Sequence, residues 1–401
     1  MAVLPCTLPS SQRPALLLGC LLSCTAALIM LTSVTVLQRA AAYFSVSTEE
    51  SVHFSAGNIL QDDAEVFPDS VYSADLDTAV TGVYLTATSV RNRDLLLTTF
   101  DRLASLEHPA VVFDVKGSYV YIEGDFPQAE ELRLMNPFFN LAEIVSLARD
   151  RGIYTIARFI VAKDTLLSAR SRDTQICNPQ TKICLGSGWV DPGNSTVLSY
   201  NQEVLEAVLR SGVDEVNFDY IRYPTEYAQS QIGLSGSQKA DHIEQFILMA
   251  RETIDRIRPQ TKLGISTYAI LGWNFPVNLE PLGQDIVRFA PYVDIISPMA
   301  YPATFAEGSY YNPAVHPVSR MYYLVYRTIT GYRELLGPEY ADKVRPWIQG
   351  YYVSAQNMRD QIAAVFDAGA HGFTVWNAQN NYTPVFTVLA EGLPDDIEAT
   401  V

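Results

Sequence analysis

Apolar and polar positions follow a regular pattern from Thr81 to about residue 376. Segments such as NQEVLEAVLRSG and HIEQFILMARETIDRIRP place apolar residues at helical spacing, and they separate short runs rich in β-branched and aromatic residues. A strand-helix pattern with eight strands favours a closed α/β barrel, the (β/α)8 TIM barrel, over an open doubly wound sheet. The eight predicted strands are TGVYLTA from Thr81, AVVFDV from Ala110, YTIARFIV from Tyr154, EVNFD from Glu215, LGIST from Leu263, VDIISPM from Val293, VRPWIQG from Val344 and GFTVW from Gly372.

The first 42 residues depart from this pattern. The run from Pro14 to Leu37 has 24 residues without a charge, whereas a cleavable signal needs about 7–15 apolar residues and a bilayer span about 20. We therefore expect an uncleaved signal anchor, a transmembrane helix. A cleaved signal peptide is the alternative, because small residues at Ala40 to Tyr43 offer a cleavage site. Residues 43–78 are polar and acidic and predict a linker or stalk, followed by the barrel domain at 79–395.

Composition and charge narrow the class of function. With 401 residues and 48% hydrophobic content, the chain can bury a large core. The formal net charge of -16 would repel a phosphate backbone, so we expect no nucleic-acid partner. No Gly-rich phosphate loop follows the first predicted strand, which disfavours a nucleotide-binding fold.

Two of the five cysteines, Cys177 and Cys184, lie beyond the N-terminal run, in the segment CNPQTKIC. Two cysteines in one polar loop indicate a small disulfide-closed loop in an oxidising compartment, with two free thiols as the alternative. We therefore expect the soluble part to lie outside the cytoplasm, anchored to the membrane or, if the signal is cleaved, secreted. The five histidines show no ligand spacing, so we expect neither a metal site nor a cofactor.

The stretch GVDEVNFDYIRYP, which begins at Gly212, combines a strand pattern with several charges. Alternation along EVNFD turns Glu215, Asn217 and Asp219 toward the barrel interior. Asp219 stands last, at the C-terminal end of the strand, where barrel enzymes place catalytic groups. Glu215 lies deepest and is expected to pair with an interior cation, Arg158 being one possible counter-ion.

Other predicted strands also end in polar or aromatic side chains. A sugar ring stacks its C–H faces on Trp or Tyr and bonds its hydroxyls to carboxylates, amides and Arg, so this mixture suits a carbohydrate groove. We predict Asp219 and Asp114 as catalytic carboxyls. The predicted substrate-binding residues are Arg158, Asp164, Asn217, Arg222, Tyr301, Gln349, Trp376 and Asn377.

Five segments resemble successive blocks of the putative glycosyl hydrolase domain family, over roughly Thr81 to Leu393. These segments are SGVDEVNFDYIRYP, IYTIARFIVAKD, VDIISPMAYP, VRPWIQGYY and GFTVWNAQNNY. The resemblance implies a TIM barrel that hydrolyses glycosidic bonds and supports Asp219 as a catalytic residue. A more distant similarity to chitinases covers Asp214, Asn217 and Asp219, but Ile221 stands where those enzymes have their acid, so a chitinase mechanism with a Glu there is excluded.

The sequence departs from the closer family at three places: Gly117 replaces an Asp, Ala303 and Thr304 stand where a Ser-His pair is usual, and Thr267 or Tyr268 replaces an Asp. These departures favour a second hypothesis, a membrane-anchored carbohydrate-binding protein with an inactive barrel. A third, a deacetylase or other metallohydrolase, needs a His and Asp ligand cluster that the sequence lacks.

The predicted reaction is hydrolysis of an extracytoplasmic polysaccharide or cell-wall glycan by a carboxyl pair. Asp219 is expected to act as nucleophile or base and Asp114 as its partner, with Asp164 and Glu226 as alternatives for the second role. A buried salt bridge from Asp219 to Arg158 or Arg222 is the structural alternative to catalysis.

Overall fold

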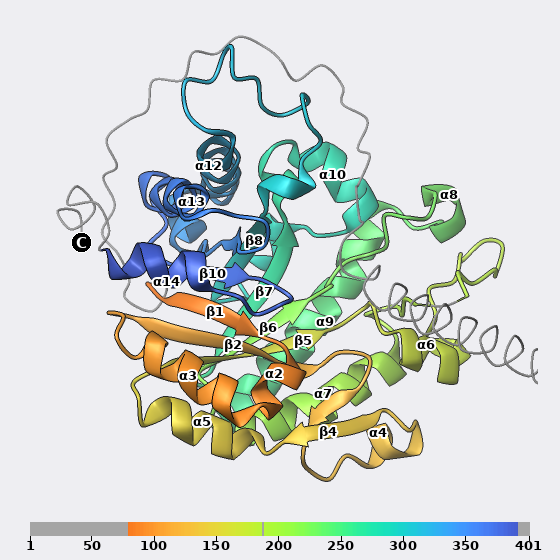
Figure 1. Cartoon of the computed structure of the whole chain (residues 1–401). Coiled ribbons are helices and arrows are strands. Elements are labelled where there is room, and N and C mark those ends of the chain that lie inside the picture. The colour runs from red at the N-terminus through yellow and green to blue at the C-terminus, as the bar shows by residue number, and fades with distance from the viewer. Residues whose placement is uncertain (1–78, 187, 392–401) are drawn as a thin grey trace, which may run out of the picture. The chain divides into compact units, whose positions relative to one another are not determined.

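The computed structural model describes residues 79–186 and 188–391, and eight of its strands form a closed parallel barrel (Figure 1). The strand order is β1-β10-β9-β8-β7-β6-β5-β2, and pairing of β1 with β2 closes the ring. Every strand predicted from the sequence is present, so the (β/α)8 prediction is confirmed for these residues. The barrel strands are β1 (Thr81–Leu85), β2 (Pro109–Lys116), β5 (Tyr154–Ile160), β6 (Glu215–Asp219), β7 (Lys262–Tyr268), β8 (Ile295–Ala300), β9 (Trp347–Gln349) and β10 (Phe373–Trp376).

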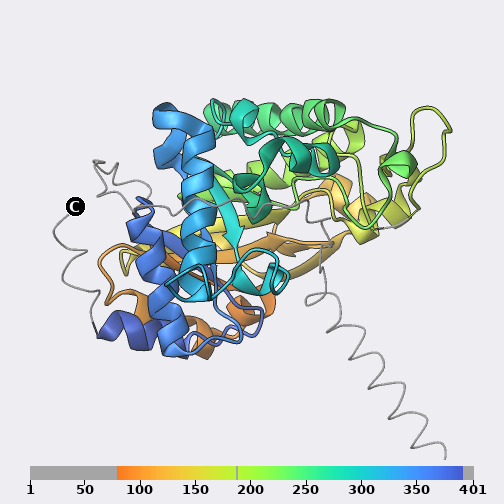
Figure 2. The same ribbon diagram turned by 90° about the horizontal axis from the view of Figure 1, so that it is seen from above.

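Helices surround the barrel strands (Figures 1 and 2). Many begin at a side-chain cap: Asn194, for example, accepts hydrogen bonds from the backbone N–H groups of Thr196 and Val197 at the start of α7. The α-helices are α2 (Ala87–Arg91), α3 (Arg93–Leu103), α4 (Pro127–Glu131), α5 (Leu141–Arg149), α6 (Thr165–Arg170), α7 (Ser195–Arg210), α8 (Gln229–Ile232), α9 (Gly236–Ile257), α10 (Phe275–Leu282), α11 (Ile286–Phe289), α12 (Arg320–Tyr340), α13 (Ala355–Asp367) and α14 (Thr383–Ala390). Short 3-10 helices are η2 (Arg172–Thr174), η3 (Ala269–Gly272), η4 (Pro302–Thr304) and η5 (Ala341–Lys343).

An excursion after β2 was not predicted from the sequence. Strand β3 (Val120–Ile122) pairs antiparallel with β2, and β4 (Met135–Phe139) pairs parallel with β3. Both strands are short, and β4 contains Pro137, which weakens a strand pattern. The sheet therefore has ten strands, of which eight form the barrel.

The interior of the barrel has a polar layer below the catalytic end. Arg345 donates a hydrogen bond of 2.6 Å to Glu215, and neither side chain is more than 1% exposed. The expected interior cation of Glu215 is therefore Arg345, whereas Arg158, named as one possible counter-ion, pairs with Asp114 and Asp219. Because the two partners are 130 residues apart in the sequence, no local pattern connects them.

The predicted disulfide between Cys177 and Cys184 is present, in the loop between η2 and α7. The cysteines also form an antiparallel bridge, and a second bridge joins Gln175 to Val190. The chemical bond thus closes a small hairpin on the connection from β5 to β6.

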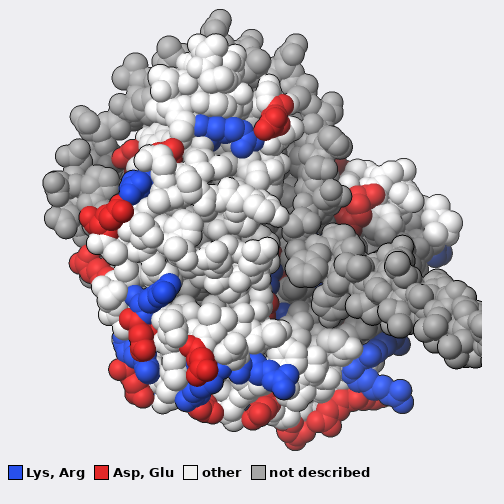
Figure 3. Space-filling model, viewed as in Figure 1, with Lys and Arg blue, Asp and Glu red and all other residues white. Residues whose placement is uncertain are grey.

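Among the residues placed by the structure, no helix has the length and apolar character needed to cross a membrane. The predicted anchor at Pro14 to Leu37 and the linker at 43–78 lie outside the described residues, so both remain predictions. On the face seen in Figure 3, Lys and Arg side chains alternate with Asp and Glu, unlike the continuous basic surface that binds a phosphate backbone.

Candidate active site

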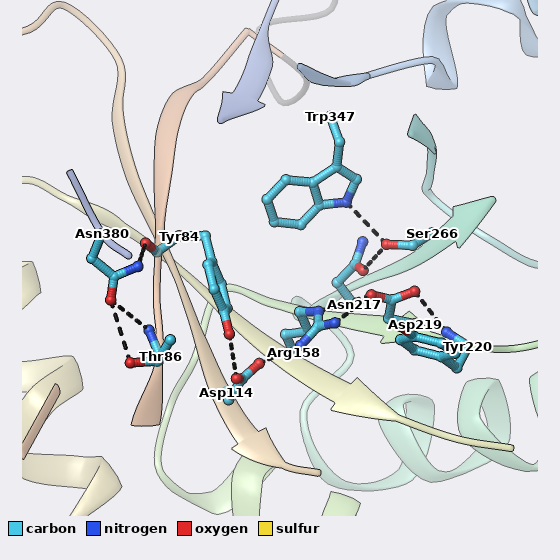
Figure 4. A network of polar contacts seen from close by, with 10 residues as sticks. All are labelled: Tyr84, Thr86, Asp114, Arg158, Asn217, Asp219, Tyr220, Ser266, Trp347 and Asn380. Atoms are coloured by element: carbon cyan, nitrogen blue, oxygen red, sulfur yellow. Dashed lines mark hydrogen bonds and ion pairs between the residues drawn. The ribbon is translucent and has the colours of Figure 1, made fainter. Parts of the chain in front are cut away.

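Four inward-facing side chains meet at the C-terminal end of the barrel (Figure 4). Tyr84 comes from β1, Asp114 from β2, Arg158 from β5 and Asp219 from β6. These strands are neighbours in the ring, and every second residue of a barrel strand points inward, which brings the four side chains together.

Arg158 connects the two predicted catalytic carboxyls. Its Nη1 donates to Oδ1 of Asp114 at 2.5 Å, while Nη2 and Nε donate to Oδ2 of Asp219 at 2.6 and 2.9 Å. One guanidinium group thus separates the carboxyls, which keeps them within the upper limit of about 9.5 Å for glycosidase carboxyl pairs.

The two carboxyl side chains are mostly buried but keep some contact with the surface. The exposed fraction of the side chain is 14% for Asp114, 10% for Asp219 and 8% for Arg158. Burial alone would lower the pKa of Arg158, but Asp219 and Asp114 outweigh it and raise that pKa well above its ordinary value. Arg158 therefore stays charged, and the trio carries one net negative charge when both carboxyls are ionised.

Tyr84 fixes the other side of Asp114, a role that the sequence analysis missed. Its hydroxyl donates a hydrogen bond of 2.5 Å to Oδ2 of Asp114, and Arg158 lies over its ring at 5.4 Å from the centroid. Burial, and then the charge of Asp114, raise the pKa of Tyr84 well above its ordinary value, so the hydroxyl remains a neutral donor. The available signal was its position as the inward-facing residue near the end of the first predicted strand.

The loop after β10 holds Tyr84 in place. The side chain of Asn380 donates to the carbonyl of Tyr84 at 2.9 Å and accepts from the backbone N–H of Thr86 at 3.1 Å (Figure 4). Asn380 adopts a left-handed backbone with φ 53°, a conformation that Asn tolerates better than most residues. The first and last barrel strands are thereby connected at the mouth of the barrel, which is its C-terminal end.

Asp219 is oriented by its own backbone as well as by Arg158. Its Oδ1 accepts a hydrogen bond of 2.6 Å from the N–H of Tyr220, whose φ of 51° is unusual for an aromatic residue. Such strained backbone is common at functional sites, where the surrounding fold maintains it. Deeper in the barrel, Ser266 donates to Asn217 at 2.7 Å and accepts from the indole N–H of Trp347 at 3.0 Å.

Aromatic rings form one wall beside the carboxyls. Trp376 is partly exposed and stacks with Tyr84 at a centroid distance of 6.3 Å and an interplanar angle of 22°. The ring centroids of Tyr301 and Trp376 are 5.9 Å apart. Burial, and to a smaller extent the charge of Asp219, raises the pKa of Tyr301. The prediction that Tyr301 and Trp376 lie near Asp219 and Asp114 thus agrees with the geometry.

Asp164 does not belong to this site. It has no exposed surface, forms a 3.0 Å ion pair with Lys116 and accepts from the backbone N–H of Leu167 as the cap of α6. A residue that contacts substrate needs accessible atoms, so the predicted binding role of Asp164, and its alternative role as the second carboxyl, do not fit the structure. Its position directly before a helical pattern was the signal of a cap.

Two residues predicted to bind substrate through their amides, Gln349 and Asn377, instead hold the loops at the C-terminal end of the barrel. Gln349, 1% exposed, accepts from the N–H of Ala303 at 2.8 Å and donates to the carbonyl of Tyr351 at 2.9 Å. Asn377, 5% exposed, donates to the carbonyl of Gly350 at 2.8 Å. Direct substrate contact is therefore a poor fit for either side chain, and the same holds for Asn217, which is 1% exposed.

Arg222 and Glu226 are likewise held by contacts with neighbouring aromatic side chains. The guanidinium of Arg222, 2% exposed, lies over the rings of Tyr268 and Trp189 at 4.5 and 4.7 Å. Glu226 accepts a hydrogen bond from the indole N–H of Trp189. Of the two partners considered from the sequence, Arg158 forms an ion pair with Asp219.

At Gly117, one of the three departures from the family pattern, a neighbouring side chain fills the space beside the backbone. A Cβ atom added at Gly117 would lie 2.6 Å from the hydroxyl of Tyr121, so Tyr121 occupies the space that a side chain would need. Within residues 79–186 and 188–391, no three His, Cys, Asp or Glu side chains converge in a way that could hold a metal ion.

Solved structures of glycoside hydrolases share this fold. The glycoside hydrolase domain of PgaB (BpsB) from Bordetella bronchiseptica is 14% identical with a TM-score of 0.56, covering 80% of this chain and 97% of that domain. The catalytic domain of a β-amylase from Paenibacillus polymyxa is 11% identical with a TM-score of 0.50, covering 81% and 99%. The spore cortex-lytic enzyme SleL from Bacillus cereus is 10% identical with a TM-score of 0.50, covering 78% and 74%. At these identities the similarity concerns the fold.

No protein with a curated function matches the sequence significantly. The family model described as "Putative glycosyl hydrolase domain" matches residues 82–382, which include the barrel strands except the first residue of β1, and all four residues of the site. The expected family is therefore confirmed. This chain belongs to the putative glycosyl hydrolase domain family.

Proposed function

We propose that the protein hydrolyses glycosidic bonds of an extracytoplasmic polysaccharide or cell-wall glycan, with Asp219 and Asp114 as the reacting carboxyls. The observation that supports this most is the bridge by Arg158, which holds two partly accessible carboxyls side by side at the catalytic end of the barrel. Membership of the glycosyl hydrolase domain family supports the same class of reaction.

We assign the role of nucleophile or base to Asp219. It accepts three hydrogen bonds, two from a permanently charged guanidinium and one from the N–H of Tyr220, and these donors fix the direction of its carboxylate. Asp114 receives the role of the acid, because its side chain is the more exposed of the two and can exchange a proton with the glycosidic oxygen.

The surroundings of the carboxyls suit an oxocarbenium-like transition state. The trio of Asp114, Arg158 and Asp219 gains one net negative charge as Asp114 gives its proton to the glycosidic oxygen, and this charge stabilises the positive charge that develops on the sugar ring. Trp376 and Tyr301 offer aromatic surface for the apolar face of that ring.

We further propose that the barrel lies outside the cytoplasm, anchored through Pro14 to Leu37. The disulfide between Cys177 and Cys184 supports an oxidising compartment, and the uncharged run supports the anchor. Sequencing of the mature N-terminus tests the anchor: an intact N-terminal segment in the membrane fraction supports it, whereas a start near Tyr43 indicates a cleaved signal and secretion.

A carbohydrate-binding protein without hydrolysis is the second candidate. It is favoured by the loss of an acidic residue at Gly117, where Tyr121 fills the space. Release of new reducing ends from soluble starch, dextran, barley β-glucan and glycol chitosan separates the two. Release by the wild-type protein supports the enzyme, and binding without release supports the binding protein.

A further inference from the structure

The loop between β9 and α13 stands at the mouth of the barrel and is firmly held. The N–H of Gly350 donates to the carbonyl of Trp376 at 2.9 Å, and its own carbonyl accepts from Asn377 at 2.8 Å. Gln349 donates to the carbonyl of Tyr351 at 2.9 Å. The two bonds of Gly350 tie the loop to the end of β10, which lies beside the proposed catalytic centre.

Tyr352, in this loop, has two unfavourable properties. Its side chain is 82% exposed, the highest fraction among the exposed large hydrophobic residues of the described chain. Its backbone is left-handed, with φ 53°, where an aromatic residue is strained and glycine would be favoured. Neither property helps folding, and strain of this kind is typical of functional positions.

A series of ring contacts connects Tyr352 with the proposed catalytic centre. Tyr352 packs edge-on against Tyr351 with the ring centroids 5.7 Å apart, and Tyr351 packs edge-on against Trp376 at 5.3 Å. Trp376 stacks with Tyr84, which bonds to Asp114. Tyr352 is thus the outermost member of an aromatic surface that begins at the reacting carboxyls.

We propose that Tyr352 binds a sugar ring of a polymeric substrate outside the cleavage centre, by stacking against the apolar face of a pyranose. This inference rests on the proposed function and adds to it a preference for long chains. An exposed aromatic ring on a fixed backbone loses little conformational freedom when it binds, so it suits this task better than a long flexible side chain.

The test compares a long and a short substrate in the full-length protein. Kinetics are measured on soluble starch, dextran, barley β-glucan and glycol chitosan, and on the matching trisaccharides, for wild type, Tyr352→Ala and Tyr352→Phe. Tyr292→Ala is the matched control, because Tyr292 is 36% exposed and precedes β8, at the opposite end of the barrel. Tyr352→Gly, which removes the ring and relieves the strained backbone, controls for folding, and its melting temperature is expected to equal or exceed that of wild type.

Tyr352→Ala and Tyr352→Gly are expected to raise KM on the polymer about tenfold, with kcat and the trisaccharide kinetics unchanged. Tyr352→Phe and Tyr292→Ala should behave like wild type. A polymer KM within twofold of wild type in both ring-deleted variants overturns the inference while leaving the proposed hydrolysis intact. If the wild type binds a polymer without cleaving it, the Kd replaces KM under the same criteria. A wild type that neither cleaves nor binds any of the polymers overturns both proposals.

Discussion

Arg158 and Asp219 form a two-bond ion pair, in which Nε and Nη2 of the guanidinium donate to one carboxylate oxygen at 2.9 and 2.6 Å. The third guanidinium nitrogen holds Asp114. The cation that orients the proposed nucleophile or base therefore also sets the position of its partner. The sequence suggested either a catalytic carboxyl pair or a buried salt bridge at Asp219. Both are present, because the carboxyl groups of the pair are also the partners of Arg158 in the salt bridge.

Two replacements of Arg158 should show separately what its positive charge and its planar shape contribute. Arg158→Lys keeps the charge but loses the planar fork, so hydrolysis is expected to fall on the order of 10²-fold with a small change in stability. Arg158→Met leaves two buried carboxylates uncompensated, and the free energy of unfolding should fall by about 3–5 kcal/mol. Steady-state kinetics and urea unfolding measure the two effects. Equal activity of Arg158→Lys and wild type would contradict a positioning role.

The ion pair between Glu215 and Arg345 should matter for folding and not for chemistry. Both side chains are sealed in the barrel, and Arg345→Met alone leaves a buried carboxylate, which should cost about 3–5 kcal/mol of unfolding free energy. The double variant Glu215→Leu with Arg345→Met removes both charges and should recover most of that loss. Urea unfolding of the single and double variants checks this. A double variant no more stable than Arg345→Met would show that the layer needs its polar contacts.

His242 should make the stability of the fold depend on pH. Its hydrogen bond with Asp191 raises the pKa of His242, and burial opposes that shift without cancelling it. A raised pKa in the folded state means that the stabilisation is fully present below the unfolded pKa, about 6.5, and is lost as pH rises through the folded value. Melting temperatures between pH 5 and about 9 should show this loss in wild type and not in His242→Gln. Parallel curves for the two proteins would refute it.

The fold was predictable because parallel barrel strands are buried on both sides and give continuous apolar runs. Short β3 and β4 were missed for the opposite reason, since each has few residues and β4 contains a proline. At the site, alternation along EVNFD predicted that Asp219 faces the interior at a strand end, and Asp114 and Arg158 were named from the two neighbouring strands. Tyr84 was missed because an inward-facing tyrosine in a strand has the same pattern as a core residue.

Strand ends alone did not separate exposed from buried polar residues. Asp114 lies near the end of β2 and Asp164 shortly after the end of β5, but Asp164 caps a helix and forms an ion pair with Lys116. The partner of Glu215 was also beyond sequence reasoning, because Arg345 lies just before β9, which is separated from β6 by two other strands in the ring. Local patterns indicate which face a side chain takes, whereas the pairing of buried charges depends on how the whole barrel closes.

The most direct test of the proposed hydrolysis is the activity of Asp219→Asn. The replacement keeps the shape of the side chain and removes the charge that the transition state requires, so release of reducing ends should fall by at least about 10³-fold. Asp214→Asn is the matched control from the same segment, since Asp214 bonds to Thr155 outside the site. That control should retain wild-type activity, and Asp219→Asn should still unfold cooperatively and bind glycan. Hydrolysis by Asp219→Asn within tenfold of wild type would contradict the assignment of Asp219 as the reacting carboxyl.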